Sequence, residues 1–188
     1  MRRSGRFWLI LGLVLAGAAF TLLAMWWVQE RAAARSVSAV LRQMEETLVS
    51  EQGGIPAEKR DEIPGLLVIP ALGLRLPVAE EWSEAALEKS PCRYAGAGEG
   101  GGLVIAGHNY AAHFGKLRRL EVGETVSFTD WQGRCRDYRV AATEILQAGD
   151  VEKMVGGEWD LTLFTCTPGG ERRFTLRCEE LSGEKAGE

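Results

Sequence analysis

The chain has 188 residues, a length that accommodates one folded domain plus accessory segments and excludes two large domains. Hydrophobic residues make up 46% and charged residues 26%, which excludes a disordered or low-complexity protein. The net charge of −4 divides into +3 over residues 1–6, zero over residues 7–28, and −7 over the remainder, which has 19 basic and 26 acidic residues. This distribution gives no clustered basic surface of the kind that binds nucleic acid, so no nucleic-acid partner is expected.

An uninterrupted apolar segment covers residues 7–28. Of its 22 residues 19 are apolar, the exceptions being Gly12, Gly17 and Thr21. A helix of this length rises about 1.5 Å per residue and spans roughly 33 Å, enough to cross a hydrocarbon core about 30 Å thick. The arginines before it place the N-terminus in the cytoplasm and everything after Gln29 outside. We therefore predict a single-pass protein of the cell membrane with an extracellular domain.

Two other interpretations of this apolar segment are less favoured. A cleaved signal peptide would use Ala32-Ala33-Ala34 as its cleavage site, but its apolar core should be about 7 to 15 residues and should not end in Trp26 and Trp27. A buried core helix is disfavoured because the segment has no polar face for water. A retained anchor and a cleaved signal peptide would both place the following domain outside the cytoplasm.

The remaining chain divides by composition. Apolar residues from Gln29 to Glu51 recur at helical spacing, and the proline-containing stretch from Gly53 to Gly65 is typical of a linker. The predicted organisation is a cytoplasmic N-terminus at 1–6, a transmembrane anchor at 7–28, a helical stalk and linker at 29–65, a catalytic or binding domain at 66–182 and a tail at 183–188.

From residue 66 the chain consists of short apolar runs separated by glycine and proline. These runs predict strands at 66–69, 74–78, 103–106, 126–129, 138–146, 161–165 and 173–178. Ser83 is placed to cap a short helix through Leu87, Asp150 to cap another, and 114–120 is expected to be a helical turn. Seven or so short strands with brief helices predict a mostly β fold, either a barrel or a sandwich with an antiparallel or mixed sheet.

The four cysteines form no CxxC pair; they are Cys92, Cys135, Cys166 and Cys178. The two histidines, His108 and His113, are five residues apart and are a weak zinc signal. An even number of cysteines outside the cytoplasm ordinarily suggests disulfides, here with three possible pairings.

Cys166 has a distinctive setting. It follows the apolar run 161–165 and opens a Pro-Gly-Gly turn, after which Arg172 and Arg173 begin the next strand. A thiolate, an imidazole and a fixed cation suit acyl transfer: the thiolate attacks a carbonyl, the imidazolium protonates the leaving amine, and the guanidinium donates to the oxyanion. On spacing alone, a structural cysteine remains the alternative.

Four runs in order resemble motifs of the sortases, the membrane-anchored cysteine transpeptidases of bacterial surfaces. The run Thr162-Leu163-Phe164-Thr165-Cys166 resembles the family's T-L-x-T-C signature. The run Leu103-Val104-Ile105-Ala106-Gly107-His108 resembles the strand that carries the family's histidine. The run Arg173-Phe174-Thr175-Leu176-Arg177 resembles the family's final, arginine-bearing strand. The opening hairpin of the family is resembled by Ile69-Pro70-Ala71-Leu72-Gly73-Leu74-Arg75-Leu76-Pro77-Val78. The resemblance covers about residues 66 to 180.

This resemblance implies an eight-stranded sortase-type β-barrel with short helices, preceded by an N-terminal transmembrane helix. It implies that Cys166 attacks the carbonyl before the scissile bond of an LPxTG-like sorting motif and forms a thioester. His108 would protonate the departing amine and deprotonate the incoming one, Arg173 would hold the substrate backbone, and Thr165 would support the oxyanion site. Arg173 is preferred to Arg172 because neighbouring residues on a strand point to opposite faces.

The resemblance also implies the partners. They are surface proteins with an LPxTG-like sorting signal, and an amine acceptor from a peptidoglycan precursor or a pilin, in a bacterium with a Gram-positive type wall. The short connection from Gln147 to Trp159 is unlike class B, and Thr167-Pro168 resembles classes C, D or E, so a class D/E-like or related sortase is expected. No cofactor is expected, although calcium is possible at Glu80, Glu81 and Glu84.

Several alternatives stay open at this stage. A membrane-tethered cysteine peptidase would use the same three residues, and a non-catalytic anchored β-domain would carry an unreactive or disulfide-bonded Cys166. His113 is the alternative base, although a solvated loop position is the simpler expectation for it. A disulfide such as Cys135 with Cys178 is compatible with the sequence, as are buried free thiols.

Overall fold

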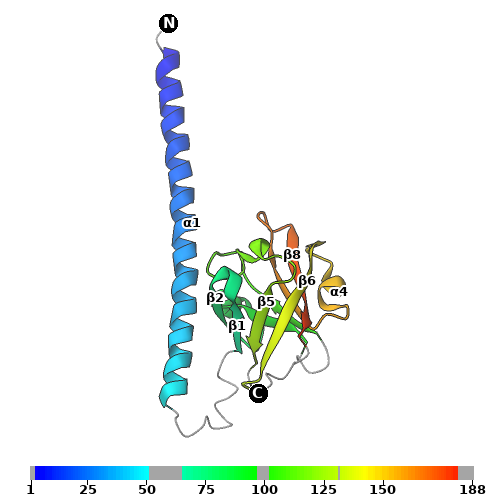
Figure 1. Cartoon of the computed structure of the whole chain (residues 1–188). Coiled ribbons are helices and arrows are strands. Elements are labelled where there is room, and N and C mark those ends of the chain that lie inside the picture. Colours follow the sequence, from blue (N-terminus) through cyan, green and yellow to red (C-terminus); the bar gives the residue numbers. More distant parts are fainter. Residues whose placement is uncertain (1–2, 51–64, 97–101, 131, 182–188) are drawn as a thin grey trace. The chain divides into compact units, whose positions relative to one another are not determined.

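The computed structural model describes residues 3–50, 65–96, 102–130 and 132–181 (Figure 1). The chain forms two compact units, residues 1–32 and 33–188. Most of the predicted linker at 53–65 and the predicted tail at 183–188 lie outside the described residues.

Helix α1, Arg3–Ser50, runs through the predicted anchor without a break. Within Phe7–Glu45 it is long and apolar enough to cross a membrane. In the first unit the Thr21 hydroxyl donates to the Ala18 carbonyl at 2.8 Å, so this polar group is satisfied inside the helix. The Arg31 guanidinium lies 3.5 Å from the Trp27 ring centroid, a cation–π contact at the end of the apolar run.

The part of α1 that belongs to the second unit has one buried stripe. Ala33 and Val37 are buried, and Leu41 packs against the main apolar core. The Ser36 hydroxyl donates to the carbonyl of Lys89 at 3.0 Å. These positions repeat every three to four residues, which is the period of one helix face.

Eight short strands form one sheet. They are β1 Gly65–Ile69, β2 Leu74–Val78, β3 Cys92–Ala95, β4 Leu103–Ala106, β5 Thr125–Thr129, β6 Cys135–Gln147, β7 Leu161–Cys166 and β8 Arg172–Glu180. Their order in the sheet is β2-β1-β5-β6-β8-β7-β4-β3. All neighbouring strands are antiparallel except β4 and β7, which run parallel.

The two edge strands of this sheet meet and close it into a barrel. Ala79, just after β2, forms a parallel bridge with Cys92 of β3. The Ala79 amide donates to the Pro91 carbonyl and the Arg93 amide donates to the Ala79 carbonyl, both at 2.9 Å. Closure removes the free sheet edges, which would otherwise be sites for edge-to-edge association.

Alternation along the strands produces two apolar cores. The barrel interior contains Leu67, Leu76, Ile105, Leu163 and Leu176, among others. A smaller cluster lies on the other face of β4 and β7 and consists of Val104, Ala106, Leu146, Met154 and Phe164. Both faces of this part of the sheet are therefore covered by apolar side chains.

The brief helices fall where the sequence predicts them, except for the 3-10 turn at Pro70–Leu72, which was not predicted. In α3, Glu84–Leu87, the Ser83 hydroxyl accepts from the Ala86 amide at 3.1 Å, as a helix N-cap does. The 3-10 turn η1 is Pro70–Leu72, and η2 is Leu117–Arg119, inside the predicted helical turn at 114–120.

Asp150 precedes α4, Val151–Val155, but its side chain caps no helix amide. Its carboxylate instead accepts from the Gln147 amide and from Lys153 Nζ, both at 3.4 Å. The predicted helix is present, and the predicted capping hydrogen bond is not.

The mostly β, eight-stranded barrel with short helices confirms the predicted fold class. All seven strands predicted from the sequence are present, and the eighth, β3, was not predicted. Only Cys92 of its four residues is fully buried, and its pairing register with β4 shifts between Arg93 and Ala95. A short, bulged strand of this kind has no clean alternation to recognise.

Candidate active site

Cys166 is the last residue of β7. Leu161 and Leu163 face the barrel interior, and alternation places Phe164 and Cys166 on the opposite, outer face. The thiol is half-buried and free. A nucleophile at a strand end is held by the sheet on one side and open to an incoming chain on the other.

Strand β8 places Arg173 directly opposite Cys166 in the antiparallel pairing. Directly opposed residues share a face, with Cβ atoms about 5 Å apart. Arg172 is directly opposite Gln147 of β6 and, by alternation, presents its side chain to the other face. The pairing register therefore favours Arg173 over Arg172 as the cation beside the thiol.

The β7–β8 turn is fixed by its backbone. The Thr167 amide donates to the Arg172 carbonyl at 2.9 Å, and the Gly170 amide donates to the Thr167 carbonyl at 2.8 Å. Gly169 and Gly170 have φ of 90° and 79°, a region that favours glycine. Arg173 Nη1 donates to the Gly170 carbonyl at 2.8 Å, so the guanidinium is itself anchored on this turn.

His108 reaches the same place from β4. Ala106 pairs with Phe164 in the parallel ladder, and the Gly107 amide donates to the Phe164 carbonyl at 3.1 Å. β4 ends at Ala106 and His108 lies two residues beyond it, while Cys166 lies two residues beyond Phe164, so the parallel pairing directs both residues to the same end of the barrel. A Cβ at Gly107 would lie 2.6 Å from the Phe114 ring, which explains a glycine just before the histidine.

The surroundings of His108 favour its neutral form. Burial lowers the pKa of the imidazole below its ordinary value, and the negative charge of Glu88 acts in the opposite direction. The ring is half-buried. The neutral imidazole can accept a proton, and the imidazolium that then forms gives the proton up readily, as a general acid must.

The other three thiols are unsuited to nucleophilic attack or lie elsewhere. Burial raises the pKa of Cys92 to about 11 and that of Cys178 to about 12, so both stay protonated. Cys135 is exposed at the start of β6, where it pairs with Thr129 of β5. All four cysteines are free, so the suggested Cys135–Cys178 disulfide is not formed.

Thr165 precedes Cys166 and is buried. Alternation places its side chain on the inner face of β7, opposite to the Cys166 side chain. Its hydroxyl oxygen has no hydrogen-bond partner in the described part of the chain. A contribution of Thr165 to an oxyanion site would therefore come from its backbone more readily than from its hydroxyl.

His113 is not the solvated loop residue expected from the sequence. It is 0% exposed and lies in the turn after β4, where its amide donates to the Tyr110 carbonyl at 2.9 Å. Its ring centroid is 6.3 Å from that of His108. A histidine that closes a turn under a strand end becomes buried, and no local sequence pattern distinguishes it from an exposed one.

The glutamates considered for calcium do not gather into a site. Glu80 forms an ion pair with Arg93 at 3.4 Å, and the Glu80 carbonyl accepts from Arg93 Nε. Within the described ranges, no group of three or more histidine, cysteine, aspartate or glutamate residues is arranged to hold a metal ion.

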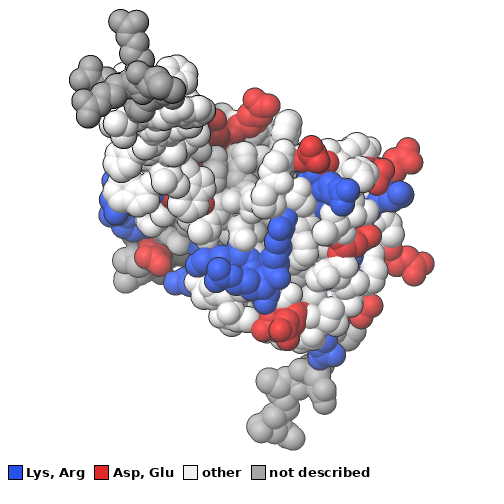
Figure 2. Space-filling view, turned by 90° about the horizontal axis from the view of Figure 1, so that it is seen from above, with Lys and Arg blue, Asp and Glu red and all other residues white. Residues whose placement is uncertain are grey.

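Charge is distributed unevenly between the two ends of the barrel. Figure 2 shows Lys and Arg gathered on the face that is seen from above, the end at which β8 begins. Arg118 and Arg119 end η2 there, and the Arg118 guanidinium lies 5.8 Å from the Phe174 ring centroid.

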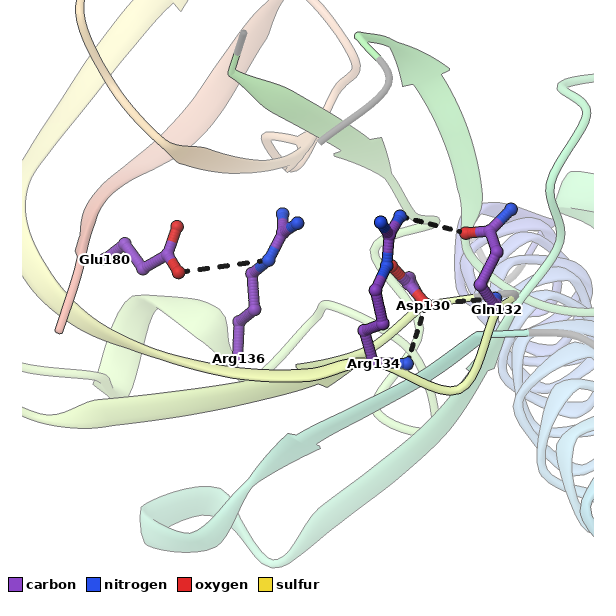
Figure 3. A network of polar contacts seen from close by, with 5 residues as sticks. All are labelled: Asp130, Gln132, Arg134, Arg136 and Glu180. Carbon is purple, nitrogen blue, oxygen red and sulfur yellow. Dashed lines mark hydrogen bonds and ion pairs between the residues drawn. The ribbon is translucent and has the colours of Figure 1, made fainter. Parts of the chain in front are cut away.

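The other end is different, because its arginines are paired with acidic groups (Figure 3). Arg134 binds Asp130 at 2.7 Å, and Arg136 lies 3.8 Å from Glu180. Among the described residues, Arg118, Arg119 and Arg173 form no ion pair with a carboxylate.

The outer face next to Cys166 is apolar and aromatic. The Tyr94 ring meets Phe164 edge-on at 5.1 Å between centroids, and Trp82 meets Tyr94 at 6.4 Å. Trp82 is 49% exposed and Met154 of α4 is buried in the same cluster. Trp82 is thus the exposed member of a cluster whose other apolar side chains are buried or half-buried.

Arg177 holds α4 against this face, a role that was not predicted from the sequence. It is 3% exposed and donates to the Met154 carbonyl at 2.9 Å, to the Thr162 hydroxyl at 3.0 Å, and to the Lys153 carbonyl. Its Nε also pairs with Glu144. An arginine in the middle of an otherwise buried strand run is the signal that could have revealed it, because a buried charge needs partners.

Comparison with known proteins gives one consistent result. The family profile described as "Sortase domain" matches residues 67–180. No match was found among curated proteins.

Solved structures of the same fold include three sortases. Sortase D5 from Clostridium perfringens, described as a transpeptidase, has a TM-score of 0.61 and 18% identity, covering 81% of this chain and 99% of that one. Sortase C from Streptococcus pneumoniae has a TM-score of 0.58 and 25% identity, covering 65% and 70%. The T196V mutant of sortase E from Streptomyces avermitilis has a TM-score of 0.54 and 27% identity, covering 64% and 88%.

Proposed function

Because the chain belongs to the sortase family, we propose that it is a membrane-anchored cysteine transpeptidase in which Cys166, His108 and Arg173 are the catalytic residues. The observation that carries this proposal is the register of three adjacent strands. Cys166 is directly opposite Arg173 on β8, and the parallel pairing of Ala106 with Phe164 supports a position of His108 at the same end of the barrel. No cofactor is invoked.

The reaction would proceed in two steps. The Cys166 thiolate attacks the carbonyl carbon before the scissile bond, and the departing amine takes a proton from the His108 imidazolium, leaving a thioester on Cys166. An incoming amine then attacks the thioester, His108 takes a proton from it, and the thiolate leaves. Arg173 donates hydrogen bonds to the substrate backbone and to the oxyanion of each tetrahedral intermediate.

The donor substrate would be a surface protein with an LPxTG-like sorting motif. The match of residues 67–180 to the sortase family profile supports this assignment. The acceptor would be an amine of a peptidoglycan precursor or of a pilin. The solved relatives of classes C, D and E and the short β6–β7 connection are in line with a class D/E-like or related enzyme rather than class B.

The location would be the outer surface of the cell membrane of a Gram-positive bacterium. The apolar part of α1 within Phe7–Glu45 supports a single span. The arginines among residues 1–6 support a cytoplasmic N-terminus, since positive residues stay inside.

Incubation of the full-length protein in detergent micelles with an LPxTG-type peptide library, with and without added amines, tests the function. Mass spectrometry should detect a thioester on Cys166 and an amide product that requires the added amine. A Cys166→Ala variant should give neither, whereas Cys135→Ala, which removes an exposed thiol elsewhere, should behave as the unmodified protein. Cleavage by Cys166→Ala would refute the proposal, and acid product that amines never divert would favour a peptidase.

A further inference from the structure

His113 is a buried polar side chain that the two proposed steps do not use. It is 0% exposed, and neither ring nitrogen makes a hydrogen bond of ordinary geometry in the described part of the chain. Leaving a buried polar group unpaired costs about 1–3 kcal/mol. An apolar side chain of similar volume would therefore be more stabilising, and stability does not account for a histidine at this position.

The ring of His113 belongs to a group of three. Its plane is inclined by 24° to that of His108, with centroids 6.3 Å apart. The Tyr110 ring is 5.0 Å from His108 and 5.7 Å from His113. Two backbone bonds hold the turn that carries them, since the His113 amide donates to the Tyr110 carbonyl and the Phe114 amide donates to the His108 carbonyl at 3.0 Å.

The charge state of His113 suits this packing. Burial and the nearby His108 lower the pKa of His113 to about 4, while the Lys89 backbone acts weakly in the opposite direction. The ring is thus neutral near pH 7 and does not repel a protonated His108. In the described residues no carboxylate hydrogen-bonds to His108, and Glu88 acts on it only through its charge.

We propose that His113 is a positioning residue whose buried ring, packed with Tyr110, holds the imidazole plane of His108 toward Cys166. The inference rests on the proposed function, because it assigns His108 as the acid and base. The ring is the acting group, since it is the part of His113 that packs beside His108 and Tyr110, whereas the Lys89 backbone that acts on the His113 imidazole does not link it to His108.

Two substitutions separate the ring from its nitrogens. His113→Phe keeps an aromatic ring and His113→Leu does not, and both remove the unpaired nitrogens, so both variants should melt at or above the temperature of the unmodified protein. We expect the Phe variant to keep kcat within about twofold, and the Leu variant to lose about tenfold in kcat with little change in KM, because a misoriented acid slows chemistry without weakening binding.

A second readout does not depend on turnover. The chain has two histidines, so in either variant His108 is the only one left, and its 13Cε1 resonance can be titrated in the full-length protein in detergent micelles. The Phe variant should keep the lowered pKa of His108. In the Leu variant the pKa should rise toward its ordinary value, because a loosened ring is better hydrated.

Three results would overturn the proposal. Equal kcat values and equal His108 titrations in the two variants would show that the ring does nothing for His108. An equal loss in both variants would assign the effect to the nitrogens, and a loss that follows the melting temperature would make the role structural. Because the titration needs no substrate, failure of the proposed transpeptidation is recognised separately.

Discussion

Replacement of Arg177 by alanine should loosen the helix that borders the candidate site. The side chain is 3% exposed and donates to two carbonyls of α4, to the Thr162 hydroxyl, and to Glu144. Glu144 is 40% exposed, so solvent screens the ion pair and its contribution is small. Each of the three remaining hydrogen bonds contributes about 1 kcal/mol to the free energy of unfolding, because water forms hydrogen bonds with the same groups in the unfolded chain, and the total is about 3 kcal/mol.

Differential scanning calorimetry of the full-length protein in detergent micelles measures this loss. A destabilisation of about 3 kcal/mol corresponds to a melting temperature lower by roughly 10 °C for a domain of this size. Arg139→Ala is the matched control, because Arg139 is an exposed arginine on β6 of the same sheet and should change stability by less than about 0.5 kcal/mol. If Arg177→Ala melts no lower than the control, the buried network does not hold α4.

Two further predictions concern the site and the thiols. Arg173→Gln should lower kcat/KM for sorting-peptide cleavage by about 10²- to 10³-fold, which is the usual effect of removing a hydrogen-bond donor to the oxyanion. Arg172→Gln should change kcat/KM by less than about threefold, and equal losses in the two variants would contradict the pairing register. Iodoacetamide at pH 8 should label Cys135 and the nucleophile Cys166 in the folded protein but should not label Cys92 and Cys178. Those two thiols are buried, and their pKa values of about 11 and 12 mean that about one molecule in a thousand or fewer carries the reactive thiolate. Peptide mass mapping reads the labels, and modification of Cys178 before unfolding would refute its burial.

The strands could be predicted where a pattern of neighbouring residues in the sequence specifies them. Alternating apolar residues bounded by glycine and proline mark β1, β2, β7 and β8, and the Pro-Gly-Gly turn fixes the register that brings Arg173 to Cys166. That pairing follows from a short turn between consecutive strands, so a sequence pattern is enough to anticipate it.

Features that depend on distant contacts were not predictable in this way. The parallel pairing of β4 with β7 joins segments separated in the chain by two other strands of the sheet, β5 and β6, and nothing local to Leu103–Ala106 specifies it. The burial of His113 and the partners of Arg177 likewise arise only when the barrel and α4 come together. Sequence similarity to a family supplied the association of His108 with Cys166 that the local pattern lacked.

The position of β8 in the sheet bears on when the enzyme becomes competent. It is the last strand in the chain, yet it lies in the middle of the sheet, between β6 and β7. Until it is in place, the barrel is open between β6 and β7, and the thiol lacks the arginine that pairs with it. A chain that is synthesised from its N-terminus would therefore carry this cysteine without its arginine until the final strand has been made and has folded.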